Sequence, residues 1–553
     1  QWNDNLSYVR GRHTMKFGTE VQRRQYNVFQ ATSPRGAISY GSVYTTNPLS
    51  PAGTGNGVAD LLLGVPQSGN IQSIAGTRGL RRTEWALYLQ DTFKVSSRLT
   101  LNYGLRYDVL FGWPWTEVAN RQAQFLPETG QVYQVGTSQV PQASGTNTDH
   151  LNLSPRVGLA YSLTPKTVIR AGYGVFYDAM PLSIDRSLAS NPPFVGIINY
   201  ANNQFDYANS WRASQGFPRP SVFPTLGANL NAVAVNATTP YVQQWNLNVE
   251  RQIPGQILLT VAYVGSKGTH LLYFPNINLP YPGPGAVASR RPYPDYGNIT
   301  YFTPSAGSNY HGLQLSAEKR AARGLSFLAS YGWAHAIDDV SSLFGSVQDP
   351  RNRVSDRGNS DYDLRQRFVF SYNWDLPLGR GRKFLTGAGR AADLLLGGWQ
   401  MNGIASFYTG FPFTPTSSTN TLNAPGSSQR AAYIGGCDPV LPDSQWTLGR
   451  YFNTACFTTP PAFTFGSSGR NILRGPGTKQ LDFSLFKNFR WSASEARYVQ
   501  LRGEFFNIFN TPQFNNPNSS IGSASAGSIS SAGSVLTFSR TQRQVQLALK
   551  IFF

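Results

Sequence analysis

The chain alternates apolar and polar residues over many short segments, and its last segment shows the pattern clearly. Residues 544–553 read QVQLALKIFF. Successive side chains of an extended strand point to opposite faces. One face therefore carries the apolar residues Val545, Leu547, Leu549, Ile551 and Phe553. Because ordinary termini are polar and loose, this stripe predicts a strand with apolar surroundings on one face up to its last residue.

The same alternation recurs along the whole chain. It is clear in LTLNYGLRYDVL (99–110), QWNLNVERQI (244–253) and RQRFVFSYNWDL (365–376). Further runs lie near 81–95, 166–178, 256–266, 323–337, 397–410, 478–490 and 495–510. A period of two residues rather than 3.6 predicts about 17 strands of about 9–15 residues, and therefore an all-β fold. GVADLLLGVP (57–66) is compatible with a short helix between two irregular strands.

The connections between these strands differ strongly in length. Short ones are expected at 11–14, 95–98, 163–166, 253–256, 321–324 and 491–495, and long ones at 112–150, 179–240, 267–307, 338–363, 411–477 and 511–540. From residue 81 onward the two kinds alternate, with 377–396 as one intermediate connection on the short side. Loops beyond about 12–15 residues are uncommon in compact soluble domains. Short periplasmic turns and long extracellular loops are typical of an antiparallel transmembrane β-barrel, which is the predicted fold.

Two soluble folds share the alternation but not the connections. A sandwich would have modest loops of similar length at both ends, and a propeller would repeat every 40–50 residues or so. Composition also favours the barrel. Aromatic residues make up 13% and charged residues only 14% of the chain, which fits a surface that does not face water everywhere. No stretch approaches the roughly 18–20 apolar residues of a transmembrane helix.

The end of the chain resembles the assembly signal of bacterial outer-membrane proteins, in which alternating apolar positions close on a C-terminal aromatic, here Phe553. Taken with the long strands and loops, the chain resembles the C-terminal part of a TonB-dependent outer-membrane receptor. It is most similar to the Oar-like branch common in acidobacteria. The stretches that carry this resemblance are 59–64, 84–108, 355–377, 470–489 and 501–518.

The resemblance implies energised uptake across the bacterial outer membrane. Such receptors bind a scarce, bulky solute outside, and a TonB complex pulls on a plug inside the barrel. The implied partners are outer-membrane lipid and lipopolysaccharide, the barrel-assembly machinery, the TonB complex and an unidentified solute. The alternative is a surface-exposed structural or adhesive barrel without active transport. A barrel enzyme would need a Ser/His/Asp cluster at the rim that the sequence does not assemble, so neither catalysis nor a cofactor is expected.

The plug and the TonB-contacting box of that family are not recognisable in this sequence. Residues 1–553 are therefore expected to be one outer-membrane β-barrel domain that is truncated at its N-terminal side. About 17 of a probable total of about 22 strands would be present. Such a sheet is expected to be an open or strained barrel with an empty lumen, and its first and last strands would have unpaired edges.

The formal net charge of +19 raises the question of nucleic-acid binding. The basic residues are scattered along strands and beside turns, which argues against that partner. Arg106, Arg170, Arg367 and Arg502 fall on the polar alternating face of their strands. In a barrel they are expected to line the lumen and to favour an anionic cargo.

Two further groups of residues carry candidate chemistry. Asp338, Asp339, Asp349 and Asp356 lie in one acidic loop and are weak calcium candidates, because calcium prefers oxygen ligands. Their spacing matches no EF-hand, and the alternative is a solvated loop whose acids pair with Arg351, Arg353 and Arg357. The five histidines lie in separate segments without metal-ligand spacing, so no other metal site is expected.

The chain has only two cysteines, Cys437 and Cys456. Both lie in the long connection 411–477, which the alternation of loops places outside the cell. Because that environment is oxidising, we expect the two cysteines to form a disulfide.

Overall fold

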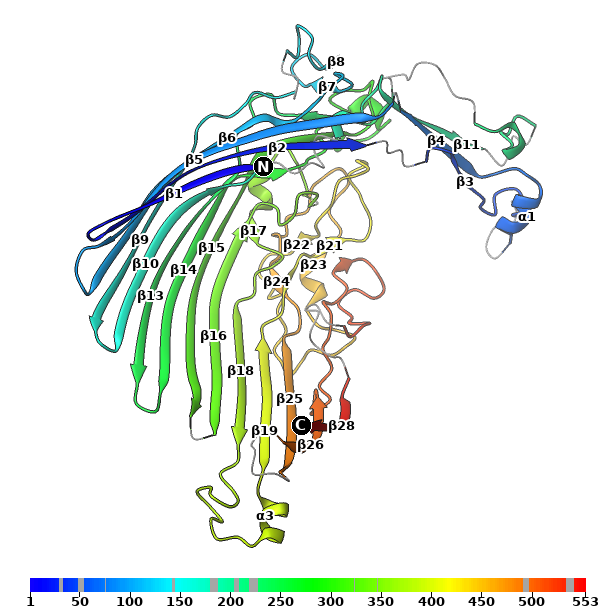
Figure 1. The fold of residues 1–553 in the computed structure, drawn as a ribbon. Helices are drawn as coiled ribbons and strands as arrows, with labels where there is room; N and C mark the ends of the chain where they lie inside the picture. The colour runs from blue at the N-terminus through cyan, green and yellow to red at the C-terminus, as the bar shows by residue number, and fades with distance from the viewer. Residues whose placement is uncertain are drawn as a thin grey trace.

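The computed structural model describes residues 1–28, 33–47, 54–74, 76–141, 145–179, 187–202, 208–217, 227–322, 324–345, 347–490, 497–533 and 542–553. The turn expected at 491–495 lies outside these residues. One large antiparallel sheet dominates the fold and sweeps in a curve from β1 to β28 (Figure 1).

The large sheet contains seventeen strands. Fifteen of them pair antiparallel, each with the next one along the chain: β1 (Trp2–Arg10), β2 (His13–Val28), β5 (Arg78–Lys94), β6 (Leu99–Glu117), β9 (Asn152–Thr164), β10 (Thr167–Tyr177), β13 (Tyr241–Ile253), β14 (Ile257–Tyr273), β15 (Ile299–Ala322), β16 (Leu325–Asp338), β18 (Gln366–Asp375), β19 (Trp399–Tyr408), β25 (Thr478–Arg490), β26 (Tyr498–Phe506) and β28 (Gln544–Phe552). The other two, β12 (Leu230–Val233) and β17 (Gly358–Asn359), are short additions to β15 and β16.

The sheet does not close on itself within the described residues. There, β1 pairs only with β2, and β28 pairs only with β26. The two ends of the sheet are therefore edges (Figure 1). Within the described residues the sheet is thus open with two edge strands, as the sequence predicts.

The two irregular strands expected between residues 29 and 80 do not belong to the large sheet. β2 pairs directly with β5 over their whole shared length, from His13↔Phe93 to Val28↔Arg78, and this leaves no edge for another strand between them. β3 (Ala37–Ser39) and β4 (Ser68–Ile74) join β11 (Val195–Ala201) in a separate sheet. That sheet and the helix α1 (Gly57–Leu62) stand apart from the large one (Figure 1).

The register carries the apolar–polar alternation from strand to strand across the large sheet. Residues directly opposite in an antiparallel pair lie on the same face. Following the pairs across the sheet, Arg106, Arg170, Arg367 and Arg502 all fall on one face. We call this the polar face.

The opposite side of the sheet is called the apolar face. Its exposed side chains include Leu87, Leu105, Leu247, Val261, Trp333, Phe407 and Leu501. In β28 it carries Val545, Leu547, Leu549 and Ile551, and Phe553 follows at the chain end. Leu547 is 79% exposed. Four exceptions, Val9, Phe176, Leu328 and Ile404, lie exposed on the polar face. An apolar surface of this extent fits lipid rather than water.

Connections at the two ends of the sheet differ as the sequence predicts. Those at one end, the short-turn end, are 11–12, 95–98, 165–166, 254–256, 323–324, 376–398 and 491–497. Those at the other, the long-loop end, are 29–77, 118–151, 178–240, 274–298, 339–365, 409–477 and 507–543. Of the short-turn connections, 376–398 contains a helix, α3 (Arg390–Leu396). None of the helices described is long and apolar enough to cross a membrane.

The long loops are folded against one another. Buried apolar clusters lie in them and at the adjoining ends of β12, β14 and β15. One cluster, which we call the loop core, joins residues of 409–477 to one of 507–543: Phe413, Ala431, Phe452, Cys456, Phe457, Leu473 and Ile521. A second joins Phe125 of β7 (Ala123–Leu126) to β12 and to Tyr296. Short strand pairs also connect segments of the loops. They are β7 with β8 (Gln131–Gln134), β20 (Pro412–Phe413) with β24 (Leu473–Arg474), β21 (Thr416–Ser417) with β27 (Ser520–Ile521), and β22 (Ala432–Tyr433) with β23 (Phe457–Thr458).

Candidate functional site

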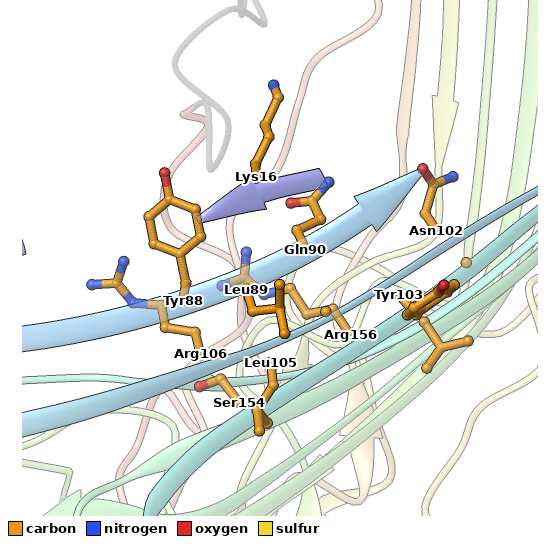
Figure 2. Close-up of a pocket in the computed structure, with 13 residues that line it drawn as sticks. Lys16, Tyr88, Leu89, Gln90, Asn102, Tyr103, Leu105, Arg106, Ser154 and Arg156 are labelled. Carbon is orange, nitrogen blue, oxygen red and sulfur yellow. The ribbon is translucent and has the colours of Figure 1, made fainter. Parts of the chain in front are cut away.

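The polar face is hollowed at several places. One hollow, of about 580 Å³, lies over β2, β5, β6 and β9, and its polar lining includes Lys16, Tyr88, Gln90, Asn102, Arg106, Ser154 and Arg156 (Figure 2). A second, of about 650 Å³, extends from β15 to β26, and a third, of about 470 Å³, from β13 to β18. Most side chains that line these hollows belong to the polar face. This face can therefore hold polar solutes along most of its width.

Two of the four predicted lumen arginines are neutralised by neighbouring acids. The Nη2 of Arg106 lies 3.1 Å from Glu20 Oε2, and its Nε lies 2.8 Å from Asp108 Oδ1. Arg170 is paired with Glu250 on the next strand. These pairs connect β6 to β2 across β5 and β10 to β13, and they leave little net positive charge at their positions.

The other two arginines lie against aromatic rings. The guanidinium carbon of Arg367 lies 5.3 Å from the ring centre of Tyr408, and that of Arg502 lies 4.5 Å from the ring centre of Phe486. Arg156, which sequence reasoning did not single out, lies 4.7 Å from the ring centre of Phe176. An aromatic ring holds a cation in place without cancelling its charge. Among these arginines, Arg156, Arg367 and Arg502 therefore keep a charge that can attract an anion, whereas Arg106 and Arg170 do not.

Asp338 belongs to a buried ion-pair network at the long-loop end. Arg470 Nη2 donates to Asp338 Oδ1 at 2.6 Å and to Ser341 Oγ at 2.6 Å. Its Nη1 donates to the backbone oxygens of Asp338 and Asp356 at 3.0 and 3.1 Å. The side chains of Arg470 and Asp338 are only 10% and 8% exposed. One guanidinium therefore fastens loop 409–477 to the end of β16 and to Ser341 and Asp356 of loop 339–365.

The other calcium candidates also have arginine partners. Asp339 pairs with Arg357 at 3.1 Å, Asp349 with Arg351 at 3.0 Å, and Asp356 with Arg430 at 3.6 Å. In the part of the chain that the structure describes, no group of three or more His, Cys, Asp or Glu residues is arranged for a metal ion. Each of the four carboxylates therefore has an arginine partner in the structure. The structure also corrects the alternative of a solvated loop, because Asp338 and Asp356 are buried.

The pair of Asp356 and Arg430 lies in the interior of the loop layer. Burial raises the pKa of Asp356, against the opposing influence of the backbone N–H of Gln348 and of Arg430. Burial likewise lowers the pKa of Arg430. Each charge therefore offsets part of the free-energy cost of burying the other. Removing one would leave the other charged and buried.

A second network surrounds Asp363, which is buried. Arg365 Nε lies 3.0 Å from its Oδ2, and Arg474 also pairs with that oxygen. Sequence reasoning did not identify Arg470 or Arg474 as partners of these acids. They are separated from them by 132 and 111 positions, and no local pattern signals such a contact.

A disulfide joins Cys437 and Cys456, with Cα atoms 5.4 Å apart, inside the range that such a bond requires. Cys456 is fully buried in the loop core, where it packs with Phe452 and Phe457. The bond therefore closes a segment of the loop layer around its own apolar core.

Replacing both cysteines by serine should loosen this segment. In the chain-entropy model a bond that closes about 20 residues contributes about 3 kcal/mol. We expect amides between 437 and 456 to exchange with solvent about 100-fold faster in the double variant, with loop 274–298 as an internal reference. Equal exchange in the variant and the parent protein would contradict this expectation.

A family model described as "Outer membrane beta barrel domain" matches residues 1–546. The chain belongs to this family. Its location is therefore the bacterial outer membrane, and the lipid-like character of the apolar face agrees with it. No curated protein matches the sequence.

Several solved structures are similar in fold to this outer membrane beta barrel domain. The outer membrane transporter YddB from Escherichia coli matches with a TM-score of 0.52 and 11% identity over 100% of this chain and 54% of that one. The siderophore receptor PiuA from Acinetobacter baumannii matches with a TM-score of 0.45 and 10% identity over 100% and 55%. The ferric yersiniabactin uptake receptor FyuA from Yersinia pestis matches with 0.43 and 9% over 100% and 53%. The chain spans about half the length of these structures.

Proposed function

We propose that this chain is the barrel portion of a TonB-dependent outer-membrane receptor that imports a bulky solute, of the Oar-like branch that the sequence resembles. The long-loop end faces the cell exterior and the short-turn end faces the periplasm. The polar face lines the solute path. The observation that carries the proposal is the combination of a hollowed polar face with a folded, cross-linked loop layer above it. Such a layer offers a shaped surface for a solute before it enters.

The remaining partners follow from the same orientation. The barrel-assembly machinery recognises β28 by Val545, Leu547, Leu549, Ile551 and Phe553. Lipid contacts the apolar face, and lipopolysaccharide phosphates contact basic side chains at the long-loop end. The TonB complex supplies the energy for uptake.

Growth measurements test the transport proposal. A strain that lacks the full gene should grow poorly on one of a panel of defined scarce nutrients, and the full gene should restore growth. The restored growth should need a functional TonB complex. A structural or adhesive barrel gives a different result: the deletion would weaken attachment or envelope integrity, but growth on every nutrient would be unchanged.

The cations that remain unneutralised on the polar face should set the charge preference of the path. Once the nutrient is identified and is an anion, Arg156→Gln/Arg367→Gln should lower its uptake several-fold, since these cations attract it along the path. The matched control is Arg106→Gln/Arg170→Gln, which removes two arginines that acids already neutralise. A larger loss in the control, or unchanged uptake in both, would remove the proposed preference for anions.

A further inference from the structure

We propose that connection 376–398, at the short-turn end, binds anionic phospholipid of the inner leaflet. Arg380, Arg382 and Arg390 would hold the phosphate, and the leucines of α3 would enter the acyl-chain region. This inference rests on the orientation proposed above, with the short-turn end at the periplasm. It does not depend on what the barrel transports.

The first observation is an exposed apolar cluster on this connection. Its members are Phe384, Leu385, Leu394, Leu395 and Leu396, and Leu395 is 69% exposed. Other connections at this end are turns of a few residues. Apolar side chains gathered on a turn favour contact with an apolar phase over contact with water.

The second observation is how α3 is attached to the sheet. Trp399 Nε1 donates to the backbone oxygen of Leu395 at 2.9 Å. Lys487 Nζ donates to the backbone oxygens of Leu395, at 3.3 Å, and Gly397. Trp399 and Lys487 are directly opposite each other in the register, and both belong to the apolar face. The last turn of α3 is therefore fastened to the lipid-facing side of the sheet, so its leucines continue the apolar face past the strand ends.

The third observation is the charge beside this cluster. Four cationic side chains, Arg380, Arg382, Lys383 and Arg390, lie in the connection with a single carboxylate, Asp393. All four cationic residues are exposed. Asp393 Oδ1 accepts the backbone N–H of Arg380 at 2.7 Å, which fixes the basic segment next to α3 (Figure 1).

Three of the four cations, together with Leu394 of the apolar cluster, line one hollow. It has a volume of about 820 Å³, and its lining includes Arg380, Arg382 and Arg390 together with Asp375 and Asp393. Guanidinium groups bind phosphate oxygens in pairs with good geometry. Interfacial segments that combine basic and apolar side chains bind membranes through both at once. A free phosphate would use the arginines only, whereas an anionic phospholipid would also cover the leucines and Phe384. The apolar cluster therefore favours an anionic phospholipid over free phosphate as the ligand.

Lipid binding to the full-length protein in detergent tests this inference. Native mass spectrometry would compare phosphatidylglycerol with zwitterionic phosphatidylethanolamine and would add inorganic phosphate as a competitor. We expect phosphatidylglycerol to be retained more strongly and not to be displaced by phosphate. Arg380→Gln/Arg382→Gln/Arg390→Gln should weaken its retention about tenfold or more, since the charge-assisted hydrogen bonds from these guanidinium groups to the lipid phosphate are lost.

The matched control is Arg98→Gln/Lys166→Gln/Arg320→Gln, which removes three exposed cations from three other hairpins at the same end. It should change retention less than twofold. Leu394→Ser/Leu395→Ser should weaken both lipids alike. Heat-modifiable gel mobility verifies that every variant is folded. The proposal is overturned if the arginine variant retains phosphatidylglycerol like the control. The exposed cluster would then be a contact surface for a protein partner. The proposal is equally overturned if inorganic phosphate displaces the lipid.

Discussion

Replacing Arg470 by methionine should lower the free energy needed to open the loop layer by about 3–5 kcal/mol. Arg470 is the common partner of Asp338 and of the backbone oxygen of Asp356, and its side chain is only 10% exposed. Removing one member of a buried ion pair leaves the other charged and without compensation, which is strongly destabilising. Hydrogen exchange should report the change as amides of 339–365 that exchange at least about 100-fold faster.

The control for this experiment is Arg320→Met. Arg320 is 85% exposed and lies 3.9 Å from Glu318, and exposed pairs contribute about 0–1 kcal/mol. Exchange in the loop layer should therefore be unchanged. If Arg470→Met behaved like Arg320→Met, the network around Asp338 would not hold the loops together.

Placing two arginines on the apolar face of the last strand should prevent assembly of the sheet in the membrane. In Leu547→Arg/Leu549→Arg both charges would face lipid, at a cost of about 2–4 kcal/mol each near the middle of the bilayer. We expect the folded, heat-modifiable form to be nearly absent from outer membranes. Gln544→Arg/Gln546→Arg adds the same charge to the polar face of the same strand and should assemble normally. Equal amounts of folded protein from the two variants would show that β28 does not separate lipid from a polar interior.

Much of the sheet can be predicted from the sequence, because its signal is local. A period of two residues identifies each strand, and the register then keeps the polar positions together from Arg106 to Arg502. The connections lie at the two ends of the sheet in turn from β1 to β28, because each antiparallel strand returns to the end from which the previous one came.

The excursion between β2 and β5 could not be placed from local pattern. β3 pairs with β4, and the second partner of β4 is β11, more than 100 positions further along the chain. A strand pattern shows that a segment can pair and not with which sheet it pairs.

The loop layer shows the same limit more strongly. The acidic residues of 336–363 are visible in the sequence, and the nearby arginines provide two of their partners, Arg351 and Arg357. The buried partners Arg470, Arg474 and Arg430 come from a distant loop. Tertiary contacts between the two loops bring these residues together, for example the backbone N–H groups of Arg430 and Gly466 that donate to Gln348 Oε1. The disulfide could be predicted because the chain offers just one possible pair of cysteines.

The central claim is that one face of the sheet lines an aqueous interior while the other faces lipid, and single cysteines along β18 test it most directly. The two native cysteines are joined to each other, so an added cysteine is the one free thiol. A charged, membrane-impermeant maleimide applied to isolated outer membranes should label cysteine at Val369, Ser371 and Asn373. It should not label cysteine at Phe368, Phe370 and Tyr372, although all six should react after unfolding in detergent. Labelling of the second set instead of the first, or equal labelling of both sets, would contradict the assignment of the two faces.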